Sequence, residues 1–143
     1  MNLRLSATVL ALAIAYLRAP TSGSESRACL RYEPDTIEIQ GLLRRHVFPG
    51  PPNCESVKAG DRAESGFYLH LTKPICFSAD STDPVNESLP SVDFIQLNLD
   101  SVGYSRLRPF LGHVVRLRGR AYGAETGHHH APVVLWFDAG PLR

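Results

Sequence analysis

The sequence predicts an all-β domain with one short helix, arranged as a small five-stranded OB-like antiparallel barrel. Several segments alternate apolar and polar residues, which is typical of half-buried strands. One segment with apolar residues at three- and four-residue steps interrupts them after the third strand. Three strands, a short helix and two more strands is the element order of the OB barrel.

The first residues predict a signal peptide. Arg4 precedes an apolar run from Leu5 to Leu17, and small and polar residues follow it. The run is short for a membrane span but typical of a secretory signal. We expect a signal peptide over residues 1–26, with cleavage somewhere in 19–28, and a single domain over 27–143. The protein would then be periplasmic or secreted and would not span a membrane after cleavage.

The charge balance argues against a nucleic-acid partner. From Arg27 onward, basic and acidic side chains are equal in number. A neutral chain has no bulk electrostatic attraction to a phosphate backbone, and an exported protein rarely meets nucleic acid.

The first strand is expected over residues 36–43. Ile37 and Ile39 share one face, and Gly41 suggests a bend or bulge. A bend suits the first strand of an OB barrel, because that strand must serve both halves of the sheet. A long loop, Arg44–Ser65, is expected next, since Pro and Gly punctuate it and no periodicity survives.

The second and third strands are expected at "GFYLHL" (66–71) and "VDFIQLNL" (92–99), with a loop over 73–91 between them. Alternation places one set of residues inward, namely Phe67, Leu69, Leu71, Ile95, Leu97 and Leu99. Tyr68 and His70 are expected to face outward.

A helix of one or two turns is expected next, with Ser101 as its N-cap and Gly112 just after its end. The last two strands are expected at "HVVRLRGRAY" (113–122) and "APVVLWFDA" (131–139). Val115, Leu117, Val133, Leu135 and Phe137 would face inward, and Tyr122, Val134 and Trp136 outward.

The three cysteines test this arrangement. Strands one and two would be antiparallel neighbours, so Cys29, before the first, would lie near Cys76, after the second. We expect a Cys29–Cys76 disulfide and a spare thiol at Cys54; a Cys54–Cys76 bond is the alternative. We expect a monomer, with a dimer linked through Cys54 as the alternative.

Several segments resemble a family of short exported bacterial proteins, domain-of-unknown-function family 4431. The matching stretches are "ACLRYEP" (28–34), "FPGPPN" (48–53), "ESVKAGDRAES" (55–65), "LTKPICF" (71–77), "IQLNL" (95–99), "LGHVVRLRG" (111–119) and "TGHHHAPVVL" (126–135). Cys54 and Ala131 depart from the family pattern, which has Tyr and Thr there. The resemblance implies a bacterial, exported single domain and no particular activity.

The stretch "ETGHHH" is the principal candidate site. OB barrels commonly bind ligands through the loops joining strands 1–2 and 4–5. Here these loops carry Asp61 and Glu64 on one side and Glu125 with the histidines on the other. In an extended strand His128 and His130 point to one side, and His129 to the other, where it would donate a hydrogen bond to a backbone carbonyl.

Imidazoles with carboxylates suit Zn²⁺, Cu²⁺ or Ni²⁺. The stronger interpretation is that the histidines satisfy the backbone groups of the turn. Acid–base catalysis ranks third, because no nucleophile or paired acid is placed by spacing. Asp61 and Glu64 either serve as ligands or tie down the long loop.

Three arginines, Arg116, Arg118 and Arg120, share the outer face of the fourth strand, near Trp136. They would form either an anion-binding face with the indole or, as we favour, a solvated polar face. Asp93 or Asp100 could neutralise them. The preferred function is therefore a small envelope binding or accessory module, not an enzyme, for a transition metal or small polar ligand. A metal- or His-dependent envelope hydrolase and a domain binding an envelope protein are the alternatives.

Overall fold

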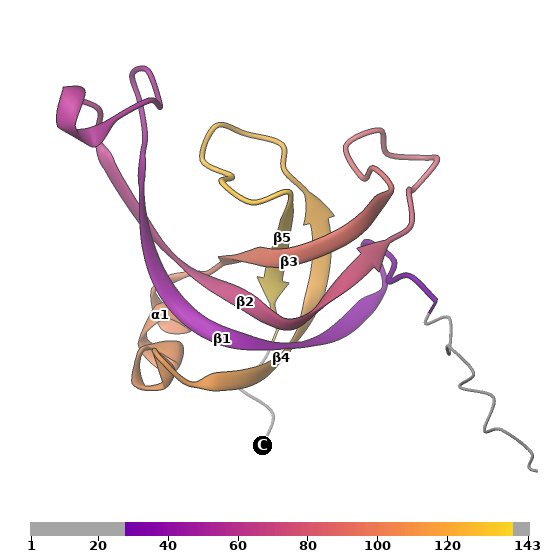
Figure 1. Cartoon of the computed structure of the whole chain (residues 1–143). Helices are drawn as coiled ribbons and strands as arrows, with labels where there is room; N and C mark the ends of the chain where they lie inside the picture. Colours follow the sequence, from indigo (N-terminus) through magenta and orange to yellow (C-terminus); the bar gives the residue numbers. More distant parts are fainter. Residues whose placement is uncertain (1–27, 139–143) are drawn as a thin grey trace, which may run out of the picture.

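The computed structural model describes residues 28–138, which form one closed five-stranded barrel (Figure 1). The elements are β1 (Thr36–Pro49), η1 (Val57–Ala59), β2 (Ala63–Phe77), β3 (Leu89–Asn98), α1 (Ser101–Leu107), η2 (Arg108–Phe110), β4 (Val114–Gly123) and β5 (Val133–Phe137). The predicted all-β class, the single short helix and the barrel are confirmed. The predicted signal peptide lies outside the described residues.

Strand β1 closes the barrel by pairing with two neighbours. Its first half, Thr36–Leu42, is antiparallel to β4, and its second half, from Gly41 to Pro49, is antiparallel to β2. The strand order around the barrel is β1-β2-β3-β5-β4, and the β3–β5 pair is parallel. This is the order expected of an OB barrel.

Gly41 is the residue at which β1 changes partners, as its position in the sequence suggested. It pairs with both Leu71 and Val115. A Cβ atom at Gly41 would lie 2.6 Å from the carbonyl oxygen of His70, so only glycine fits where the two ladders overlap. The strand curves strongly through this region (Figure 1).

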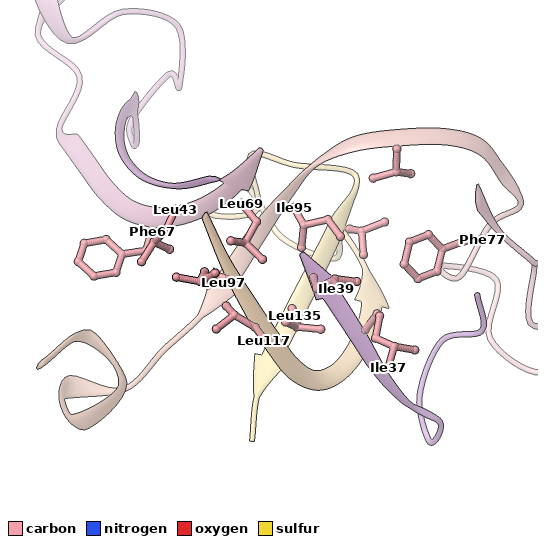
Figure 2. Packing of buried hydrophobic residues seen from close by; sticks show 14 of the residues in the cluster. Ile37, Ile39, Leu43, Phe67, Leu69, Phe77, Ile95, Leu97, Leu117 and Leu135 are labelled. Atoms are coloured by element: carbon pink, nitrogen blue, oxygen red, sulfur yellow. The ribbon is translucent and has the colours of Figure 1, made fainter. Parts of the chain in front are cut away.

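The core consists of the inward side chains that alternation predicted. Ile37, Ile39, Leu69, Ile95, Leu117 and Leu135 all lie inside the barrel (Figure 2) and are almost completely buried. Phe77 closes one end, where its ring packs on Tyr32 with centroids 4.9 Å apart. Burial of each such side chain stabilises the fold by about 1.5–3 kcal/mol.

Two predicted loops were wrong in extent. The Arg44–Ser65 segment is strand at both ends, because 44–49 pairs with 63–68, and only 50–62 forms the connection. Strand β2 likewise continues to Phe77, and β3 begins at Leu89. Proline in these segments argued against strands, because it lacks the amide proton that a strand donates to its neighbour. At the end or the edge of a strand that donor is not needed, so proline can be accommodated there.

The β1–β2 segments 44–49 and 63–67 therefore form a two-stranded arm that extends beyond the barrel. The β2–β3 pairing stops at Tyr68, and the β1–β4 pairing stops at Leu42, so the arm's strands pair only with each other among the described residues. In Figure 1 the arm curves upward toward the side on which the β4–β5 loop lies.

The helix begins one residue earlier than a Ser101 cap would require. Asp100 is the N-cap, and its carboxylate accepts a 2.7 Å hydrogen bond from the amide of Gly103. An ionised carboxylate also interacts favourably with the helix N-terminus. Gly112 follows η2 with a φ of +84°, as a residue at the end of a helical segment often does.

Three residues expected on the outer face are instead buried: Tyr68, Tyr122 and Val134. His46 and Phe48 of the arm pack on Tyr68, and His129 of the β4–β5 loop packs on Tyr122. Alternation within single strands could not show this cover. Trp136 does face outward and is 46% exposed.

The predicted Cys29–Cys76 disulfide is present, and Cys54 is a free, exposed cysteine. A parallel bridge from Leu30 to Phe77 continues the attachment of the N-terminal segment to β2. A disulfide within the chain is consistent with an oxidising compartment. No helix among residues 28–138 is long and apolar enough to cross a membrane.

We expect the disulfide to be a major contributor to stability. The two cysteines are 47 positions apart, so the loop-entropy argument gives a loss of about 4 kcal/mol in the free energy of unfolding for Cys29→Ser/Cys76→Ser. Urea denaturation measures the loss. Cys54→Ser is the matched control and should leave the midpoint unchanged; an equal loss in both variants would contradict the assignment.

Candidate functional site

The arm brings one carboxylate against the histidine-rich loop. Oε1 of Glu64 accepts a 2.7 Å hydrogen bond from Nδ1 of His128, and Oε2 lies 3.3 Å from Nε2 of His130. The three residues come from segments more than sixty positions apart. Figure 1 shows how the arm and the β4–β5 loop lie at the same end of the barrel.

Electrostatics favour an ionised Glu64. The hydrogen bond from His128 lowers the pKa of this carboxyl below its ordinary value, and His130 acts in the same direction. The two histidines differ in environment: the side chain of His128 is 65% exposed, whereas that of His130 is 14% exposed. The side chain of His128 can therefore turn toward solvent more readily than that of His130.

Gln96 on β3 fixes the histidine loop to the barrel. Its Nε2 donates to the carbonyl of His128 at 3.0 Å, and its Oε1 accepts from the amide of His130 at 2.7 Å. One amide side chain thus satisfies two loop backbone groups that no strand pairs. Sequence analysis did not single out Gln96, although its outward position on β3 was implied by the alternation.

His129 points away from Glu64, as predicted, but its expected hydrogen bond was wrong in direction. Its Nδ1 accepts from the amides of Glu125 at 2.9 Å and Thr126 at 3.4 Å, because the turn presents amides there instead of a carbonyl. Its ring packs on Tyr122 with centroids 5.6 Å apart. Burial lowers the pKa of His129, which suits the neutral acceptor form.

Asp61 and Glu125 do not join the three residues at Glu64. Both oxygens of Asp61 are held within the 50–62 loop, where Oδ1 accepts from Asn53 and Oδ2 from the amides of Glu55 and Ser56. These bonds, that of Ser56 first, lower the pKa of Asp61. Of the two roles considered for Asp61, the structure displays the contacts of the loop-fixing one.

Glu125 is exposed, and its carboxylate makes no hydrogen bond or ion pair within residues 28–138. Across the same residues, no group of three or more His, Cys, Asp or Glu side chains is placed to hold a metal ion. Glu64 instead contacts each of the two histidines, His128 and His130, directly.

A pocket of about 330 Å³ lies beside this cluster. Its walls include Glu64, Ser65, Gly66, Tyr68, Gln96, Tyr104, His128 and His130. The volume is in the range of small-molecule sites. Glu64 is the one carboxylate among the lining residues, and no Lys or Arg is among them.

An aromatic cluster that sequence analysis missed supports the pocket. It comprises the rings of His46, Phe48, Tyr68, His70, Phe94 and His130. His130 stacks on Phe48 at 4.6 Å with an interplanar angle of 6°, and Tyr68 stacks on Phe94 at 4.9 Å. Hydrophobic alternation does not reveal this segment of β1, because the apolar Val47 is exposed whereas the polar His46 is partly buried.

His46 and His70 form a close pair inside the cluster. Their Nε2 atoms are 2.7 Å apart, so one ring must donate and the other accept. Burial lowers the pKa of His46, and His70 and Arg44 lower it further. The contact therefore holds at most one proton between the two Nε2 atoms.

The arginine stripe lies on β4, whose neighbours are β1 and β5, and does not line this pocket. Arg116, Arg118 and Arg120 are exposed, as expected. The proposed pairing with Asp93 or Asp100 was wrong, because Asp138, at the end of β5, approaches Arg120 at 3.7 Å and Asp100 caps α1. Arg118 lies opposite Glu38 on β1, which fits a mixed polar face.

Residues 94–136 match the model of a family described as a domain of unknown function, DUF4431. The resemblance to that family is confirmed. The matched segment runs from Phe94 on β3 to Trp136 on β5 and includes Gln96 and the three histidines, whereas Glu64 lies outside it. No curated protein and no solved structure matches the chain.

Replacement of Asp61 tests the loop contacts. In Asp61→Ala the amides of Glu55 and Ser56 lose their acceptor, and we expect several-fold faster proteolytic cleavage within 50–62 and a lower melting temperature. Limited proteolysis with mass spectrometry locates the cut. Glu55→Ala removes a neighbouring exposed carboxylate and is expected to leave both readouts unchanged; equal effects would refute the special role of Asp61.

The His46–His70 pair makes stability depend on pH. Because the pKa of His46 is lower in the folded than in the unfolded protein, its neutral form favours folding, and this contribution is lost as pH falls through the ordinary histidine pKa of about 6.5. We expect His46→Gln to lose less stability than the unsubstituted protein between pH 7.5 and 5.5, measured by denaturant unfolding. His113→Gln, an exposed histidine outside the cluster, should keep the original dependence.

Proposed function

We propose that this chain is a small binding module of the cell envelope or the extracellular space, and that its ligand binds at Glu64, His128 and His130. One observation carries the proposal: Glu64 on the arm contacts both histidines on the β4–β5 loop, beside a pocket. OB barrels commonly bind their ligands on this face. Export rests on the expected signal peptide and is supported by the intrachain disulfide.

The chemistry of the pocket favours a neutral hydroxyl-bearing or cationic ligand. The ionised Glu64 can accept hydrogen bonds from hydroxyl or amino groups, and the imidazoles can turn to donate or accept. No Lys or Arg belongs to the walls of this pocket. An anionic group placed directly beside Glu64 would be repelled, which disfavours phosphate or carboxylate at this point.

A transition-metal ion is the second candidate, because two imidazoles and a carboxylate are a ligand set found in zinc enzymes. The direct hydrogen bonds would have to open for an ion to enter, and the exposed side chain of His128 permits such a rotation. Hydrolysis has less support, since the hydroxyl of Ser65 is bonded to Arg45 and not to His128.

A titration with two kinds of probe tests the proposal. Glucosamine represents cationic, hydroxyl-bearing ligands, and Zn²⁺, Cu²⁺ and Ni²⁺ represent the metals. In an NMR titration we expect glucosamine to shift the amide resonances of Gly66 and Gln96 in a saturable way. The affinity for glucosamine should fall at least about tenfold (~1.4 kcal/mol) in Glu64→Gln. His113→Ala is the control and should bind as the unsubstituted protein does.

The outcomes separate the two candidates. Micromolar binding of a metal that is lost in His128→Ala/His130→Ala would favour the metal site. Glucosamine binding lost in Glu64→Gln would favour the small polar ligand. Failure of both probes to perturb residues of the pocket would contradict the proposal.

A further inference from the structure

A second pocket lies on the opposite face of the arm, where the arm meets the end of α1 and η2. Its volume is about 350 Å³, and its walls include Arg45, Ser65, Gly66, Phe67, Tyr104 and Arg108. Arg45 lies opposite Phe67 in the β1–β2 ladder, on the continuation of the barrel's inner face. Arg108 opens η2 immediately after α1.

The charge of this pocket is positive. Both arginines line it and no acidic residue does. Among residues 28–138, the ion pairs use Arg31 and Arg120 but neither Arg45 nor Arg108. The one hydrogen bond of these two guanidinium groups is from Arg45 to the hydroxyl of Ser65, at 3.3 Å. Two guanidinium groups facing one pocket repel each other, and a bound anion would relieve that repulsion.

The donors suit an oxyanion. A guanidinium fork matches the planar or tetrahedral oxygen arrangement of carboxylates and phosphates. The phenol of Tyr104 adds a neutral donor, because burial raises its pKa and keeps the hydroxyl protonated. Its ring is fixed edge-on against Phe67, with centroids 4.9 Å apart.

The positive pocket adjoins the Glu64 pocket. Ser65, Gly66 and Tyr104 line both. This part of β2 lies beyond the last β2–β3 pair, Tyr68 with Gln96, so no third strand separates the two pockets. Gly66 has no side chain to fill the passage, and a Cβ atom there would lie 3.1 Å from the ring of Tyr68.

We propose that the Arg45–Arg108 pocket binds the anionic group of a ligand whose hydroxyl or amino groups occupy the Glu64 pocket. The inference rests on the proposed function and narrows its ligand class to a small polar acid, such as a sugar acid or a sugar phosphate. The two pockets would then recognise opposite ends of one molecule around the free edge of β2.

Inorganic phosphate tests the anion pocket by itself. We expect saturable shifts of the Ser65 and Gly66 amides in NMR titration, weakened at least tenfold in Arg45→Gln/Arg108→Gln. The matched control is Arg62→Gln/Arg106→Gln, which removes the same charge from exposed positions outside the pocket and should bind phosphate nearly as before. Absence of saturation, or equal loss in both double variants, would overturn the proposal.

Glucuronate and glucose then test whether the pockets act together. We expect glucuronate to bind at least tenfold more tightly than glucose, and this preference to vanish in Arg45→Gln/Arg108→Gln. In Glu64→Gln, phosphate binding should persist while binding of the sugar part weakens. Equal affinity for the two sugars would overturn the joint site, yet glucosamine binding sensitive to Glu64→Gln would still support the proposed function.

Discussion

The double pairing of β1 is the constraint on which the structure depends. One strand must follow β4 with its first half and β2 with its second, and Gly41 permits the close approach of both ladders. The resulting curvature closes the barrel and directs the remainder of β1 out of it. The arm, and therefore the position of Glu64, follows from that change of partner.

The candidate site is held by contacts that belong to each segment separately. Asp61 organises the tip of the arm through its own loop, and Gln96 holds the histidine loop on β3. The pair Glu64–His128 then joins two segments that are already shaped. Such preorganisation reduces the conformational entropy that a ligand would otherwise have to remove on binding.

Sequence periodicity was sufficient for the barrel because its core strands alternate strictly. Ile37, Leu69 and Leu117 lie where the pattern placed them, and strand adjacency led to the Cys29–Cys76 bond. The convergence of Glu64 with His128 also followed from the loop positions of an OB barrel.

The arm was hidden because its outward residues are aromatic or histidine instead of polar. His46 and Phe48 break simple alternation, and their packing partners, such as Phe94, are distant in sequence. The pocket of Arg45 and Arg108 was hidden for a different reason. Its two charges come from different elements, and only the folded chain places them together.

The arm has a thermodynamic consequence for recognition. A two-stranded ribbon is marginally stable alone, and beyond Leu42 and Tyr68 this one has no neighbouring strand among the described residues. Its order therefore depends on side contacts, of which Glu64 with the histidines is one. A ligand that binds Glu64 replaces the contacts of Glu64 with the histidines, which help to keep the ribbon ordered. Its affinity therefore depends on how well the ribbon stays ordered in the complex. Two ligands that make the same polar contacts would then differ in affinity if they differ in how firmly they hold the ribbon in place.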